Sequence, residues 1–139
     1  MLAVGLGAAC ALATDLKPMT SIRALRDHLW EALQHRFGGR IVVNGHPERR
    51  LPNTLNVSFV GKVGAEVLAS LDGVAASTGS ACHAGLVELS PELAAMGVPE
   101  AIGMGAIRFS LGRTTEAEID AVVDQLRAPL PPAESPGGS

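Results

Sequence analysis

The chain has 139 residues, of which 47% are hydrophobic and 18% charged, so it is long enough for one domain with a buried core. Its formal net charge is −3 and no basic stripe appears, which argues against a nucleic-acid-binding function. Its two cysteines, Cys10 and Cys82, lack metal-ligand spacing and fit a reducing compartment better than a disulfide scaffold.

The N-terminal segment predicts two helices. Residues 1–13 are apolar, lack the basic start of a signal peptide and are too short to span a bilayer. Their small side chains suit a helix packed closely against a large body, with Cys10 as inert packing. Pro18 and Ser21 interrupt this run, and a second amphipathic helix follows until the glycine pair at residues 38–39. Its expected apolar face is Ile22, Leu25, Leu29, Leu33 and Phe37, with Arg23, Arg26, Asp27 and Glu31 outside.

The middle of the chain predicts strands. Residues 41–43 form a short strand closed by a turn, and residues 46–53 form a loop. Residues 54–60 form a second strand with alternate apolar side chains facing the core, namely Leu55, Val57 and Phe59. A short helix over 64–71 and a brief strand over 74–76 follow.

The C-terminal half completes an α+β fold. A helix begins at Ser90 with Pro91 in its first turn, a strand covers 106–111, and a closing helix covers 115–126. The tail, 128–139, is rich in proline and glycine and is expected to be disordered. The sequence therefore predicts a small mixed or antiparallel sheet covered by helices.

Cys82 lies in a run of small and polar residues, 77–85, that contains no large hydrophobic side chain. Such a run has little to anchor it in a core, so we expect a mobile surface loop. A cysteine on such a loop is suited to act as a nucleophile, provided that its surroundings favour the thiolate. The adjacent His83 is expected to solvate the loop.

Three ordered motifs carry a family resemblance: residues 50–59 (RLPNTLNVSF), 77–82 (STGSAC) and 107–116 (IRFSLGRTTE). Together they resemble the C-terminal part of the cysteine desulfurases, class V aminotransferases of the iron–sulfur assembly and nitrogen-fixation branch. The resemblance implies that residues 1–127 are the small domain of a fold-type I pyridoxal-phosphate enzyme that converts L-cysteine to L-alanine.

The resemblance also implies roles for two residues. Cys82 would receive sulfur as a persulfide, pass it to an iron–sulfur scaffold or thiolation acceptor, and could bind an iron–sulfur cluster transiently; no other metal site is expected. Arg108 would bind the substrate carboxylate, although an internal salt bridge is the plainer interpretation of a charged residue in a strand. Arg113 is expected to be structural, and Asn53 and Asn56 to orient loops without a catalytic role. A cytoplasmic homodimer is implied for the full-length enzyme.

The cofactor lysine of the family is missing. Neither Lys17 nor Lys62 lies in the family's Ser-x-His-Lys motif. The resemblance therefore implies that a large domain upstream of Met1 holds pyridoxal phosphate, and that the chain is a fragment or a truncated reading frame, inactive alone. Two alternatives remain: a stand-alone persulfide carrier and an inactive remnant. Another class V enzyme would not need the cysteine loop.

Overall fold

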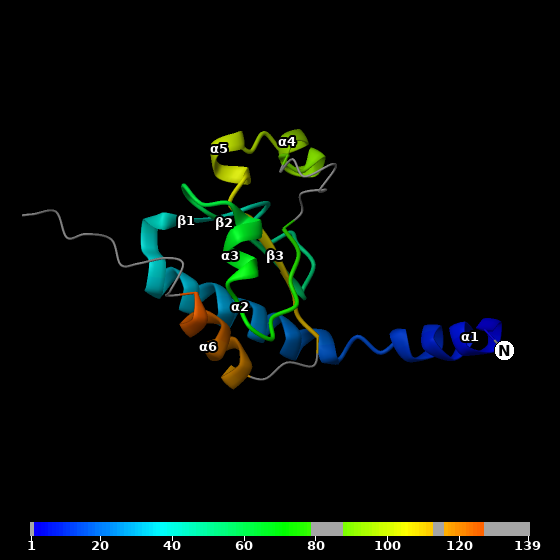
Figure 1. Cartoon of the computed structure of the whole chain (residues 1–139). Helices are drawn as coiled ribbons and strands as arrows, with labels where there is room; N and C mark the ends of the chain where they lie inside the picture. Colours follow the sequence, from blue (N-terminus) through cyan, green and yellow to red (C-terminus); the bar gives the residue numbers. More distant parts are fainter. Residues whose placement is uncertain (1, 79–87, 113–115, 127–139) are drawn as a thin grey trace, which may run out of the picture.

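The computed structural model describes residues 2–78, 88–112 and 116–126 (Figure 1). Six α-helices, one 3-10 helix and three strands occur in these ranges. In chain order they are α1 (Leu2–Ala13), α2 (Pro18–Phe37), η1 (Gly38–Arg40), β1 (Ile41–Val43), β2 (Thr54–Phe59), α3 (Gly64–Ala69), α4 (Pro91–Ala95), α5 (Glu100–Gly103), β3 (Ala106–Ser110) and α6 (Glu116–Gln125). No helix in the described ranges has the length and hydropathy needed to cross a membrane.

The three strands form an antiparallel sheet in the order β1-β2-β3. Val43 lies opposite Val57 in the first pair, and Asn56 lies opposite Arg108 in the second. This sheet, with helices packed against it, confirms the predicted α+β fold.

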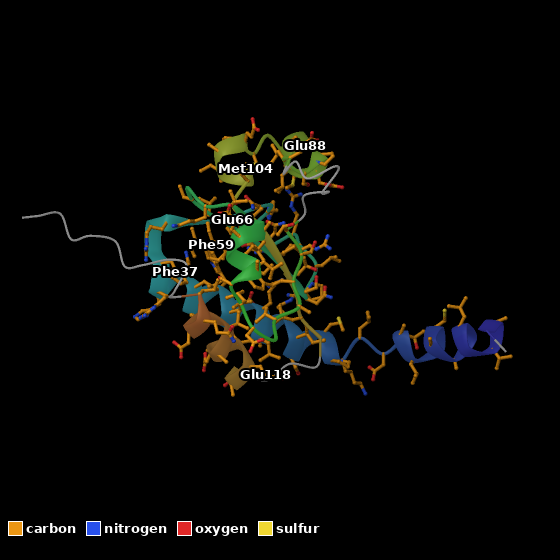
Figure 2. The ribbon with its side chains drawn as sticks, in the orientation of Figure 1. Phe37, Phe59, Glu66, Glu88, Met104 and Glu118 are labelled. Carbon is orange, nitrogen blue, oxygen red and sulfur yellow. The ribbon has the colours of Figure 1, made fainter. Side chains whose placement is uncertain are left out.

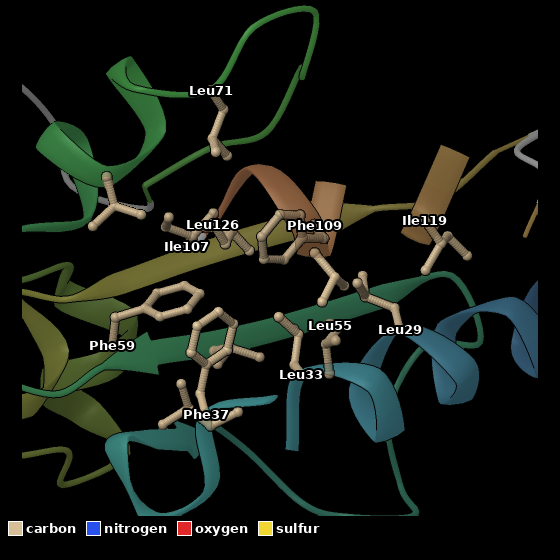
Figure 3. Packing of buried hydrophobic residues seen from close by; sticks show 14 of the residues in the cluster. Leu29, Leu33, Phe37, Leu55, Phe59, Leu71, Ile107, Phe109, Ile119 and Leu126 are labelled. Carbon is tan, nitrogen blue, oxygen red and sulfur yellow. The ribbon is translucent and has the colours of Figure 1, made fainter. Parts of the chain in front are cut away.

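One face of the sheet is buried under α2 and α6, which lie side by side (Figures 1 and 3). Leu55, Val57 and Phe59 of β2 are fully buried, which confirms the predicted inward positions, and Ser58 between them is buried as well. The Phe37 ring meets that of Phe59 edge to face with centroids 6.1 Å apart, and this geometry suits the aromatic quadrupoles. The core is therefore apolar and largely aliphatic, as the scarcity of aromatic residues requires.

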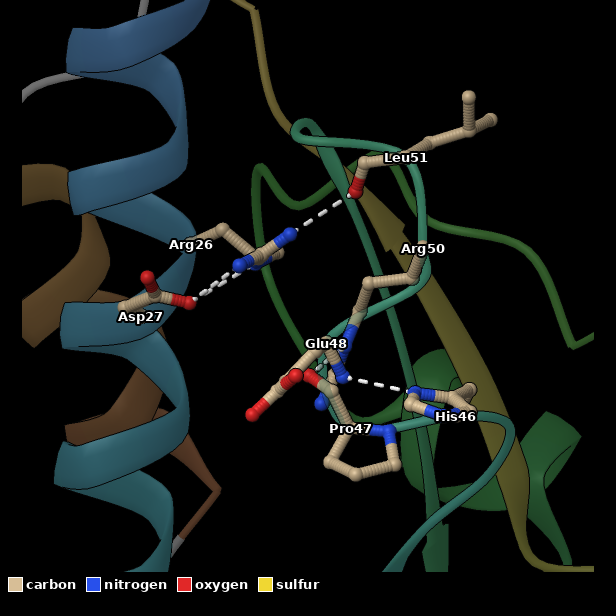
Figure 4. A network of polar contacts seen from close by, with 7 residues as sticks. All are labelled: Arg26, Asp27, His46, Pro47, Glu48, Arg50 and Leu51. Atoms are coloured by element: carbon tan, nitrogen blue, oxygen red, sulfur yellow. Dashed lines mark hydrogen bonds and ion pairs between the residues drawn. The ribbon is translucent and has the colours of Figure 1, made fainter.

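The start of α2 and the position of Arg26 differ from the prediction. The first helical run is interrupted as predicted, at residues 14–17 between α1 and α2. Pro18 lies in the first turn of α2, where its missing N–H costs nothing, so the second helix already begins at Pro18 and includes Ser21. The Arg26 side chain, expected in solvent, is buried: its Nη1 donates to the carbonyl of Leu51 at 3.0 Å, and its Nη2 pairs with Asp27 at 2.6 Å (Figure 4). The 44–53 loop therefore covers this arginine and is held against α2 by it.

The segment after α3 also differs from the prediction. Residues 74–76 do not form a strand, and only Ser77 pairs with β3, as an isolated bridge to Arg108. The helix α5 had no counterpart in the sequence analysis. The tail 128–139 lies outside the described residues.

Helix α1 extends away from the rest of the molecule (Figures 1 and 2). Residues 3–13 are exposed, and Val4, Leu6 and Leu12 have 66–79% of their surface accessible. Cys10 is exposed as well. The expectation that Cys10 is packed and poorly accessible is therefore wrong in this structure, because no described element covers α1.

Gly105, directly before β3, allows the chain to approach the end of β2 closely. The backbone N–H of Phe59 donates to the Gly105 carbonyl at 2.9 Å, and a Cβ at Gly105 would overlap the carbonyl oxygen of Phe59. We expect Gly105→Ala to destabilise the fold by about 3 kcal/mol, the upper end of overpacking costs. Urea unfolding measures this loss.

Gly39 provides the matched control. A Cβ at Gly39 would meet open space, so Gly39→Ala should change the free energy of unfolding by less than about 0.5 kcal/mol. Equal effects of the two substitutions would contradict the close approach at Gly105.

Candidate functional site

A polar row crosses the sheet on the face opposite the core. It consists of Asn44, which directly follows β1, then Asn56 of β2, Arg108 of β3 and Ser77. Asn44 donates its backbone N–H to the Asn56 carbonyl at 2.9 Å, which extends the β1-β2 ladder by one residue. Asn56 and Arg108 are register partners, and Ser77 bridges to Arg108. Side chains of directly opposed strand residues share one face, so this row brings two amides, a guanidinium and a hydroxyl together.

Arg108 is the exposed member of this row, between Asn56 and Ser77. It alternates along β3 with the buried Ile107 and Phe109, so its side chain leaves the sheet on the polar face. The internal salt bridge was considered because an unpaired charge is costly to bury, and an exposed Arg108 does not incur that cost. Among the described residues, Arg108 forms no ion pair. A solvent-facing guanidinium on a rigid strand can bind a carboxylate through a bidentate pair of hydrogen bonds.

Ser77 connects the Arg108 strand to the segment that carries the cysteine motif. The Ser77 N–H donates to the Arg108 carbonyl at 3.1 Å, and the Arg108 N–H donates to the Ser77 carbonyl at 2.6 Å. These reciprocal bonds attach the chain five residues before Cys82 to the candidate carboxylate-binding residue. Cys82 itself lies outside the described residues, as do His83 and Arg113.

Helix α4 is capped by the Ser90 hydroxyl, which also binds the carboxylate of Glu92 in the first turn. Ser90 Oγ accepts from the Leu93 N–H at 3.3 Å and donates to Glu92 at 2.5 Å, which confirms the helix start predicted at Ser90. The hydrogen bond from Ser90 lowers the pKa of Glu92 most, the Glu92 backbone N–H adds to this, and the positive charge of Arg108 contributes further. Glu92 is therefore an anion within electrostatic reach of Arg108.

Two hollows among the described residues lie away from the polar row. A cavity of about 300 Å³ lies between the 72–75 segment, the end of β3 and α6, and a groove of about 450 Å³ runs between α2 and α6. Neither is lined by Arg108 or by a lysine. Over the described part of the chain, no three His, Cys, Asp or Glu side chains converge on a metal position. We therefore base the candidate site on the polar row.

The chain is similar in sequence to curated cysteine desulfurases. The chain is 47% identical over 131 residues to cysteine desulfurase 2 of Trichormus variabilis, and this alignment covers 91% of the chain and 32% of that protein. It is 45% identical over 126 residues to a cysteine desulfurase of Gluconacetobacter diazotrophicus, covering 87% of the chain and 31% of that protein. No protein-family model matches the chain.

Solved structures agree with the sequence matches. A NifS-like protein from Rickettsia africae superposes with a TM-score of 0.73 at 26% identity, over 89% of this chain and 32% of that one. In sequence and fold, the chain matches part of the cysteine desulfurases, consistent with their C-terminal part. A second NifS-like protein superposes with a TM-score of 0.62 at 31% identity, over 81% of this chain and 28% of that one. The chain thus spans about a third of the length of the cysteine desulfurases it matches.

The described residues do not fit pyridoxal phosphate, the cofactor that the resemblance to cysteine desulfurases implies. A cofactor lysine has to lie in a site that also holds the phosphate and the pyridinium nitrogen. Lys17 is exposed at the N-terminus of α2, and Lys62 is exposed in the turn after β2. Neither lysine lines either of the two hollows described above.

Two members of the polar row, Asn44 and Asn56, were not predicted to lie at the site. Asn44 was interpreted only as part of a turn signal, and Asn56 as a residue that orients a loop, whereas the structure places Asn56 in a strand beside Arg108. Asn53 does hold a loop: its carbonyl accepts from the Leu111 N–H at 2.8 Å. The available signal was the alternation along β2, because residues between the buried Leu55 and Val57 have to face the other side of the sheet.

Proposed function

We propose that this chain provides the small domain of a pyridoxal-phosphate-dependent cysteine desulfurase, with residues 1–127 as that domain. The net reaction transfers the sulfur of L-cysteine to the Cys82 thiol, which yields L-alanine and a Cys82 persulfide. The persulfide sulfur then passes to an iron–sulfur scaffold or a thiolation acceptor. The strong sequence identity to cysteine desulfurases supports this assignment.

The observation that carries the proposal is the bridge between Ser77 and Arg108. It attaches the chain that leads to Cys82 to the strand that presents an exposed guanidinium. A carboxylate bound by Arg108 would therefore lie within reach of a thiol five residues beyond Ser77, since a trans-peptide chain extends by at most about 3.6 Å per residue. In this arrangement Arg108 orients the substrate, and Cys82 accepts its sulfur.

The cofactor is proposed to belong to the part of the cysteine desulfurases that this chain does not cover. We expect the 139-residue chain alone to release no sulfide from L-cysteine, and addition of a matching N-terminal large domain to give cysteine-dependent sulfide release in the presence of a dithiol, which reduces the Cys82 persulfide back to the thiol. Borohydride reduction of the mixture with pyridoxal phosphate, followed by peptide mapping, should label the large domain and leave Lys17 and Lys62 unmodified.

Two results would contradict this assignment. Stoichiometric labelling of Lys17 or Lys62 would place the cofactor on this chain. Sulfur loading of Cys82 from a small-molecule persulfide, with no sulfide release after the large domain is added, would favour the stand-alone persulfide carrier.

A further inference from the structure

The amide of Asn56 is held in one orientation by its neighbour Asn44. Asn44 Nδ2 donates to Asn56 Oδ1 at 2.8 Å and to Ser58 Oγ at 2.8 Å. A side-chain amide nitrogen carries only two hydrogens, so both donors of Asn44 are used. With Asn44 in this orientation, turning the Asn56 amide over would set two NH₂ groups against each other, which disfavours the turned Asn56 amide.

Burial protects this arrangement. Asn44 is 8% exposed and Ser58 is fully buried, whereas Asn56 is half-buried. Hydrogen bonds in a buried setting are costly to break, because water does not replace them easily. The end of the polar row at Asn44 is therefore a rigid support, whereas the side chain of Arg108, on the other side of Asn56, is open to solvent.

The oxygen of the Asn56 amide faces β1, so its nitrogen is left for the β3 side. β1 and β3 flank β2 on opposite sides, and Arg108 is the direct β3 partner of Asn56. Among the described residues, none accepts a hydrogen bond from Asn56 Nδ2. Two unused N–H donors of Asn56 and the five guanidinium donors of Arg108 thus start from directly opposed residues of neighbouring strands, on the same face of the sheet.

We propose that Asn56 is a second substrate-binding residue, which donates from Nδ2 to the same carboxylate that Arg108 binds, and that Asn44 is the positioning residue that orients it. A carboxylate has about four lone-pair positions, of which a bidentate guanidinium uses two, so a third donor can be accommodated. This inference rests on the proposed role of Arg108 and extends it to a recognition unit for the α-carboxylate of an amino acid.

The first test uses the unmodified chain and no cofactor. Titration with L-alanine, the product, should shift the NMR signals of the Arg108 Nε–H and of the Asn56 side-chain NH₂ with one common dissociation constant. Ethylamine, which lacks the carboxylate, should shift neither. The side-chain NH₂ of Asn53 serves as the internal control, because Asn53 lies outside the polar row.

The second test uses substitutions. Asn56→Ala should weaken L-alanine binding by about tenfold, the loss expected for one hydrogen bond to a charged group. Asn56→Asp keeps the shape and the acceptor for Asn44 but places a carboxylate beside Arg108, so it should weaken binding further. Asn44→Ala should give a smaller loss through disorder of the Asn56 amide. Ser110→Ala, on the same face and register-paired with Thr54, should bind like the unmodified chain.

The outcomes separate the two proposals. If Arg108 responds to L-alanine and Asn56 does not, the Asn56 inference fails and the Arg108 role stands. If neither responds, the Arg108 role fails and the inference fails with it. Because the titration of the unmodified chain requires no substitution, the test remains decisive even if a variant does not fold.

Discussion

Replacement of Cys82 by alanine is expected to abolish cysteine-dependent sulfide release by the reconstituted enzyme. Alanine has no thiol that can accept sulfur from L-cysteine, and a thiolate is the reactive form in sulfur chemistry of this kind. The loss should fall on turnover, because Arg108 and Asn56 remain to bind the substrate. The measurement is sulfide released per minute from the chain and a matching large domain, with and without the substitution.

The matched control is Cys10→Ala. Cys10 is an exposed thiol on α1. If any accessible thiol could support sulfide release, removing either cysteine would lower the activity. We expect Cys10→Ala to retain the activity of the unmodified protein. Sulfide release that survives Cys82→Ala would overturn the assignment of Cys82, and equal losses from both substitutions would point to a general thiol effect.

Replacement of Arg108 by alanine is expected to weaken the binding of L-cysteine strongly. Truncating one side of a charge-assisted bidentate contact costs about 2–4 kcal/mol, which corresponds to roughly 30- to 1,000-fold in affinity. The effect should appear mainly as a rise in KM, because the Cys82 thiol is unchanged. Steady-state kinetics over a wide range of L-cysteine concentrations separates KM from kcat.

Two further variants test whether the effect depends on the guanidinium group and on position 108. Arg108→Lys keeps the charge and loses the planar fork, so its KM should lie between those of the unmodified protein and Arg108→Ala. Ser110→Ala changes the next residue on the same face of β3, which is exposed, and should leave KM unchanged. An unchanged KM in Arg108→Ala would show that this guanidinium does not bind the substrate carboxylate.

The negative charge of Glu92 is expected to influence substrate binding at Arg108. It is an exposed carboxylate within electrostatic reach of Arg108, and the charge of Arg108 contributes to lowering the pKa of Glu92. An incoming carboxylate at Arg108 therefore meets a nearby negative charge on α4. Because all these groups face solvent, salt screens the direct attraction of the substrate carboxylate to Arg108 as well as this weaker repulsion, so the affinity for L-cysteine should fall as the ionic strength rises.

The elements of this fold that depend on local pattern were predictable from the sequence. The alternation Leu55, Val57, Phe59 predicts a half-buried strand, and each of these side chains is fully buried. Ser90 followed by Pro91 predicts a helix start, and Ser90 does cap α4. In each case the signal lies within a few residues, because strand alternation and helix capping are set by neighbouring backbone geometry.

Long-range contacts decided the features that the sequence alone did not reveal. Arg26 has the helical position of a surface residue, yet it is buried because the Leu51 carbonyl, 25 residues away, accepts its hydrogen bond. Ser77 pairs with β3 although residues 74–76 form no strand, because the backbone N–H and carbonyl of Arg108 form hydrogen bonds with it.

The sequence motifs by themselves determined the family resemblance and the candidate pair Cys82 and Arg108. Only the tertiary structure decided that Asn44 orients Asn56 and that Asn56 lies beside Arg108. The physical reason is that strand register joins residues that are distant along the chain, and no local pattern encodes which amide oxygen a neighbouring strand will hold.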